Sequence, residues 1–173
     1  MKIKVNRGYL ILVRYLILLA LVFSLEVIYK IFTPITIYPV IWLLRILFDS
    51  VILNGSFILI NFEKPIEIIS ACIGSSAYLL LLILNLSVPM QARKRIYSLI
   101  VSILLFLALN VLRIVLFASL YANDFKYFYF THKIFWYAFS TLFVVLIWFF
   151  VVRFYNVKDI PIYSDLKYLI RKI

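Results

Sequence analysis

Four apolar stretches, each close to the length of a membrane-crossing helix, constrain the fold more than any other feature of the sequence. They cover residues 9–31, 72–90, 96–121 and 132–154. Because a helix rises about 1.5 Å per residue, about 20 apolar residues cross a hydrocarbon core about 30 Å thick. Hydrophobic residues make up 66% of the 173 residues, which is more apolar surface than a water-soluble core of this size can bury. The sequence therefore predicts an all-α polytopic membrane protein with about four transmembrane helices, forming one integral membrane domain over residues 1–173.

Two segments between the first and second stretches differ in character. Residues 33–49 are apolar, but two prolines and two charged side chains interrupt them, and a full crossing would invert the orientation of everything that follows. We therefore expect an interfacial or re-entrant helix there. Residues 51–69 place turn signals at Asn54-Gly55 and at Glu63-Lys64-Pro65 between β-branched and aromatic residues, which predicts a small extracytoplasmic hairpin.

The formal net charge of +11 is distributed in short basic clusters between the apolar stretches. This distribution is typical of cytoplasmic loops and argues against nucleic-acid binding. Most of the 18 Lys and Arg residues fall inside if the N-terminus is cytoplasmic, and the first stretch, which lacks a cleavage site, is predicted to be an uncleaved signal anchor. Residues 155–173 are predicted to form a cytoplasmic basic amphipathic tail on the membrane lipids. We expect a multi-pass protein of the cytoplasmic membrane with both termini inside.

Three polar islands interrupt the apolar sequence: residues 70–77 around the only cysteine, residues 110–113, and residues 130–133 around the only histidine. Each position can be measured from the cytoplasmic end of its own predicted helix. Cys72 then lies at about 28 Å, Arg113 at about 27 Å and His132 at about 32 Å. In a hydrocarbon core about 30 Å thick, all three are at the outer boundary. The sequence therefore predicts one extracytoplasmic site made from three segments.

These three groups suit acyl transfer. A thiol becomes a strong nucleophile when a neighbouring cation favours the thiolate, and Arg113 is a candidate for that cation. His132 can hold the thiol proton and return it to a leaving amine, while Arg113 can also stabilise an oxyanion. We therefore predict Cys72, Arg113 and His132 as catalytic residues.

Four further polar or small residues are predicted to support this site. Asn110 follows one turn below Arg113 and can orient Arg113 or His132, or donate a hydrogen bond itself. Gly74 lets the backbone pass close to a substrate chain, and Ser75 and Ser76 can cap the helix start or bind that substrate. One cysteine and one histidine with scattered carboxylates make no metal site, so neither a metal nor a cofactor is expected.

Each of these residues also has an ordinary structural explanation. A lone cysteine usually behaves as a small hydrophobic residue, an arginine near a helix end snorkels, and small residues serve helix packing. The intramembrane Asn-x-x-Arg pair at residues 110–113 fits such explanations less well, because buried polar groups in a membrane are costly and face a partner or a cavity. The alternative function is a non-catalytic membrane assembly or partner subunit of an export or polysaccharide system.

The motif Ala71-Cys72-x-Gly74, the basic loop after the next helix, Asn110-x-x-Arg113-Ile114, and an outer loop ending in His132 together resemble the exosortase/archaeosortase family. The resemblance covers about residues 33–154. Histidine in the last position is similar to the bacterial members. The chain departs from the usual family pattern at Ser70, where Glu is common, and at Ile73, where Ser or Thr is common.

This resemblance implies a membrane-embedded cysteine transpeptidase or protease that works through a thioacyl-enzyme. Its partners would be exported proteins that end in a short motif, a transmembrane helix and a basic tail. By the same likeness Cys72 is the nucleophile, and Arg113 and His132 complete the catalytic trio.

Overall fold

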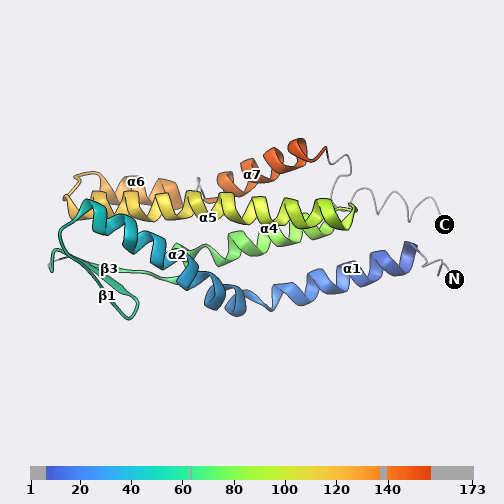
Figure 1. Ribbon diagram of the computed structural model, residues 1–173, viewed down its shortest axis with the longest axis horizontal. Coiled ribbons are helices and arrows are strands. Elements are labelled where there is room, and N and C mark those ends of the chain that lie inside the picture. Colours follow the sequence, from blue (N-terminus) through green and yellow to red (C-terminus); the bar gives the residue numbers. More distant parts are fainter. Residues whose placement is uncertain (1–6, 63, 137–139, 157–173) are drawn as a thin grey trace.

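The computed structural model describes residues 7–62, 64–136 and 140–156, and most of these are helical (Figure 1). In chain order the elements are α1 (Arg7–Val22), α2 (Leu25–Leu47), β1 (Val51–Asn54), β2 (Phe57–Ile60), β3 (Lys64–Glu67), α3 (Ser70–Ile73), α4 (Ser75–Ser87), α5 (Ala92–Ala122), α6 (Phe128–Ile134) and α7 (Ser140–Phe154). Helices α2 and α5 are long and apolar enough to cross a membrane by length and composition, and α4 is a shorter apolar helix. The chain is therefore mainly α-helical, with two candidate membrane-spanning helices among the described residues.

Helix α5 is the longest helix among the described residues, and the other elements are arranged around it, with α1 extending past its start (Figure 1). Helices α1 and α2 follow one another along one side, while α4 and α7 pack against α5. The sheet and α6 lie at the end of the bundle where α2 and α5 finish. The start of α5 and the ends of α4 and α7 lie at the opposite end.

The N-terminal segments are divided differently from the prediction. The expected boundaries were a span over residues 9–31 and a separate interfacial or re-entrant helix over 33–49. Instead α1 ends at Val22, where both the N–H (3.0 Å) and the hydroxyl (2.6 Å) of Ser24 donate to the carbonyl of Leu21. Helix α2 then continues through both prolines of the segment. A proline inside a helix leaves a backbone carbonyl without its N–H donor. In membrane helices prolines are tolerated because neighbouring helices and Ser or Thr side chains satisfy such groups.

The expected hairpin is a three-stranded antiparallel sheet in the order β1-β2-β3. Its first turn agrees with the Asn54-Gly55 signal, and Gly55 has a left-handed φ of 61°. The second turn was misplaced: Asn61 and Phe62 carry positive φ angles of 51° and 63°, while Lys64 and Pro65 belong to β3. A proline is tolerated there because β3 is an edge strand, on which one row of N–H groups needs no partner strand.

One of the predicted spans is also interrupted: Gly74, with a left-handed φ of 78°, separates α3 from α4 within the predicted span 72–90. The described residues of the predicted span 132–154 include the end of α6, with His132, and all of α7. The predicted tail over 155–173 lies almost entirely outside the described residues.

Two apolar cores follow one another along the bundle. At the sheet end, the buried face of β2 packs with α2, α3 and α5 through residues such as Leu44, Ile58 and Ile73. The second core joins α4, α5 and α7 around Tyr78 and Phe106, whose rings meet edge to face with centroids 4.7 Å apart. Residue 74 lies at the junction of these cores, because it connects Ile73 of the first to the helix that carries Tyr78.

A buried polar network joins α4 and α5 further from the sheet. The amide of Asn85 donates to the Leu81 carbonyl (2.9 Å) and to the Ser102 hydroxyl (3.4 Å), and the Ser98 hydroxyl donates to the Asn85 side-chain oxygen. Asn85, Ser98 and Ser102 are fully buried. Hydrogen bonds of this kind hold helices together in apolar surroundings.

Candidate active site

Cys72, Arg113 and His132 line one cavity of about 280 Å³. Its walls are residues 65–69, the C-terminal half of α5, and α6 with the residues just after it. The three side chains come from α3, α5 and α6, which are far apart in the sequence. The structure thus brings the predicted trio together, and the chemical role of each residue stays a prediction.

The cysteine is carried by a single helical turn. Helix α3 begins after Ile69, whose extended backbone carbonyl accepts the N–H of Cys72 (2.9 Å). It ends at Gly74, whose N–H donates to the Ser70 carbonyl (3.2 Å). The side chain of Cys72 is partly exposed and forms no disulfide. The thiol therefore faces the cavity from a short turn that other elements must hold in place.

Helix α5 holds that turn through two side chains. The Asn110 amide donates to the carbonyls of Cys72 and Ile73, each at 3.0 Å. One turn further on, the Arg113 guanidinium donates to the carbonyls of Cys72 (3.3 Å) and Ala71 (3.5 Å). Asn110 is only 2% exposed. Of the roles predicted for it, the structure shows a hydrogen bond to the backbone of the cysteine segment.

His132 lies among aromatic rings. Its ring stacks on Phe128 (centroids 5.5 Å apart, 15° between planes) and meets Phe117 edge to face at 5.1 Å. The centroid of the Trp136 ring lies 5.8 Å from that of the His132 ring. Partial burial, and then the positive charge of Arg113, lower the pKa of His132 below its ordinary value of 6.5. The imidazole is therefore neutral at neutral pH and able to accept a proton.

Several residues that line the cavity were not predicted from the sequence. Phe128 and Trp136 stand four residues before and after His132, a spacing that places side chains on one helix face. Phe117 stands four residues after Arg113 by the same rule. The signal was therefore present as aromatic residues at helical spacing around the only histidine. Residues 65–69, which include the last three residues of β3, were missed because Pro65 was assigned to a turn.

Gly74, Ser75 and Ser76 do not line the cavity. A Cβ added to Gly74 would lie 2.9 Å from the Phe106 ring, so its close neighbour is this ring rather than a substrate chain. Ser75 and Ser76 border a separate shallow cavity of about 390 Å³ together with Glu26 of α2. Helix α4 begins after Gly74 without a side-chain cap from either serine. The predicted substrate contacts of these three residues therefore find no support in their placement.

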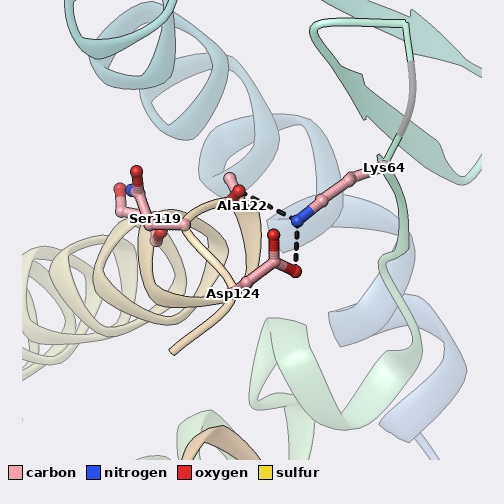
Figure 2. Close-up of polar contacts among 5 residues, drawn as sticks. Lys64, Ser119, Ala122 and Asp124 are labelled. Carbon is pink, nitrogen blue, oxygen red and sulfur yellow. Dashed lines mark hydrogen bonds and ion pairs between the residues drawn. The ribbon is translucent and has the colours of Figure 1, made fainter. Parts of the chain in front are cut away.

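The sheet side of the cavity is attached to α5 by Lys64. Figure 2 shows its ammonium group directed at the carbonyl of Ala122 (3.1 Å) and at the carboxylate of Asp124, with which it forms an ion pair. A cation at the C-terminus of a helix also interacts favourably with the helix dipole. This contact connects the first residue of β3 to the end of α5. It therefore holds one wall of the cavity against another.

The cavity presents a thiol, a guanidinium and a neutral imidazole within a largely aromatic and aliphatic wall. Within residues 7–62, 64–136 and 140–156, no group of three His, Cys, Asp or Glu residues is arranged to hold a metal ion. A thiol beside a proton acceptor and a cation is the combination that acyl transfer uses.

No protein-family model, no curated protein and no solved structure matches the chain.

Proposed function

We propose that the protein is a membrane-embedded, exosortase-like cysteine transpeptidase or protease that cleaves C-terminal sorting signals of exported proteins. The observation that carries this proposal is the meeting of Cys72, Arg113 and His132 around one cavity, from three separate elements. A structural cysteine has no need of an imidazole and a guanidinium around the same cavity.

The reaction begins when the Cys72 proton passes to the neutral imidazole of His132. The sulfur attacks the carbonyl carbon of a substrate peptide bond, and Arg113 stabilises the negative charge that forms on the carbonyl oxygen. The C–N bond then breaks, and the leaving nitrogen takes the proton from His132. The remaining thioester is attacked by an amine acceptor or by water, which loses a proton to His132 and releases the Cys72 sulfur.

The surface supports a membrane setting for this reaction. Large apolar side chains are exposed along the helices, including Trp42 (65%), Leu104 (57%) and Phe149 (65%). Many large apolar side chains exposed along helices are typical of contact with lipid. We place four crossings in the membrane, formed by α1 with α2, by α4, by α5 and by α7.

The orientation follows from the charges of α5. Its first turn contains three basic residues, Arg93, Lys94 and Arg95, which favour the cytoplasmic side. Arg113 lies 18 residues further along, which corresponds to about 27 Å. We therefore propose that the cavity lies at the outer face of the cytoplasmic membrane, with both termini inside.

The test compares C-terminal peptides of exported and membrane proteins by mass spectrometry. Cells carry the wild-type chain, a deletion, Cys72→Ala, or the control Thr141→Ala, whose side chain is exposed and outside the cavity. We expect one set of proteins to keep its C-terminal helix and basic tail in the deletion and in Cys72→Ala only. If Cys72→Ala processes every protein as the wild type does, Cys72 is not the nucleophile, and the non-catalytic partner subunit becomes the better account.

A further inference from the structure

One edge of the sheet forms a wall of the cavity. Strand β3 is the last strand in the order β1-β2-β3, so among residues 7–62, 64–136 and 140–156 it pairs with a neighbour on one side only. Residues 65–69, which continue from β3 to the turn that carries Cys72, all line the cavity. An unpaired edge strand is a template for another extended chain unless it is covered or blocked.

The pairing with β2 determines which backbone groups point to this edge. The N–H of Ile68 donates to the carbonyl of Ser56 (2.8 Å), and Ile66 lies opposite Ile58. Backbone groups alternate in direction along an antiparallel strand. Those of Ile66 and Ile68 therefore point to β2, whereas those of residues 65, 67 and 69 point away from it.

Pro65 agrees with this assignment. A proline has no N–H, so in a sheet it is confined to positions where that group faces away from a partner strand. The outward edge offers four groups: the Pro65 carbonyl, both backbone groups of Glu67 and the Ile69 N–H. The Ile69 carbonyl already accepts the N–H of Cys72. These four backbone groups lie on the residues that directly precede the turn with Cys72, the proposed nucleophile.

We propose that the substrate binds as an added β-strand along the outer edge of β3, with its scissile bond delivered to the Cys72 sulfur. This inference rests on the proposed function and specifies its substrate: an extended peptide segment rather than a helix or a folded domain. Backbone pairing supplies affinity, and alternate side chains supply specificity in such complexes. The ion pair of Lys64 with Asp124 keeps β3 in position for this pairing.

The edge amides can be removed one at a time by proline. Glu67→Pro and Ile69→Pro each remove an outward N–H, and Glu67→Ala and Ile69→Ala keep it. Ile69 has φ −89° and ψ 167°, which is close to the conformation that proline adopts. The opposite edge gives a matched control: Asn61 donates to the Ser50 carbonyl (3.0 Å), so the N–H of Leu53 points away from β2 on the far side of the sheet. Leu53→Pro removes that N–H without touching the cavity.

The readout is the rate at which C-terminal segments are removed in cells, followed by mass spectrometry after a short induction. We expect each proline variant to process about tenfold more slowly than its alanine counterpart, and Leu53→Pro to process at the wild-type rate. Alkylation of Cys72 by iodoacetamide, which needs no added strand, shows whether the site is intact. If Glu67→Pro and Ile69→Pro match their alanine counterparts while Cys72→Ala is inactive, strand addition is wrong and the proposed function stands.

A second measurement decides the question if both proline variants lose Cys72 alkylation and have therefore misfolded. The Cys72→Ala chain is mixed with the uncleaved C-terminal peptide of a protein that accumulates in the deletion cells, and amide hydrogen exchange is followed. We expect the Glu67 and Ile69 amides to exchange at least about tenfold more slowly with the peptide than without it. Equal exchange rates with the peptide bound overturn the added strand.

Discussion

Replacing Gly74 by alanine tests how the cysteine turn is held between the two cores. Gly74 adopts φ 78° and ψ 34°, a left-handed conformation that ends α3. An alanine Cβ there would lie 2.9 Å from Cζ and 3.0 Å from Cε1 of Phe106. The Phe106 ring is 3% exposed and packs against Tyr78, so it has little room to move. The variant therefore combines backbone strain with overpacking.

The two contributions have different sizes and can be separated. A left-handed backbone costs an alanine about 1–2 kcal/mol. Overpacking a well-filled core costs about 1–3 kcal/mol more. Gly55 provides the matched control, because its φ is 61° and a Cβ there has nothing within 4 Å. Gly55→Ala should therefore lower the free energy of unfolding by about 1–2 kcal/mol and Gly74→Ala by about 2–5 kcal/mol.

The assay is equilibrium unfolding of both variants in detergent micelles, with Cys72 alkylation measured on the folded protein. The double variant Gly74→Ala/Phe106→Leu should recover part of the loss, because it removes the contact but not the backbone strain. If Gly74→Ala is no more destabilising than Gly55→Ala, the contact with Phe106 does not hold the turn. The Phe106 ring would then have moved aside for the added Cβ, and the prediction of overpacking would be wrong.

Four further predictions concern the site and its support. Arg113→Gln should raise the pKa of His132, whereas Arg113→Lys should not, as read from the NMR titration of the only histidine in the chain. Folding lowers this pKa below 6.5, so the unfolded state binds the proton more tightly. The stability that His132 contributes should therefore be complete above pH 6.5 and be lost as the pH falls from 6.5 through the lower pKa of the folded state, unlike in His132→Asn. Asn110→Leu should cost about 1–3 kcal/mol of unfolding free energy and also slow processing, because the Ile73 carbonyl loses its donor and the Cys72 carbonyl keeps Arg113 alone. Asn85→Leu should cost about 1–2 kcal/mol but leave processing per folded molecule unchanged, because it lies far from the cavity; equal effects of both Asn variants on processing would contradict this.

The sequence predicted that Cys72 and Arg113 lie at the same level better than it predicted how the site is built. Counting residues from the basic loop at a constant helical rise gives both residues the same level, and the Arg113 guanidinium donates to the Cys72 carbonyl. The first β-turn was also predictable, because Asn54-Gly55 favours a left-handed backbone at a hairpin. These features depend only on local chemistry.

The remaining features depend on contacts between segments. The continuation of α2 through two prolines is decided by tertiary packing, which outweighs local propensity. The neighbour of Gly74 is Phe106, 32 positions later, and no local pattern specifies that contact. For the same reason Pro65 was assigned to a turn, although the β2 pairing makes it an edge residue.

Arg113 illustrates why geometry has to be separated from electrostatics at this site. Its guanidinium donates to the carbonyl of Cys72 and also lowers the pKa of His132, so it positions one partner and tunes the other. Loss of activity in Arg113→Gln would not distinguish these effects. Arg113→Lys keeps the charge but not the planar array of donors, so it should preserve the low pKa of His132 while weakening the hold on the cysteine turn. A lysine variant with an unchanged His132 titration and slow Cys72 alkylation would therefore assign the main role of Arg113 to positioning, whereas unchanged alkylation would assign it to charge.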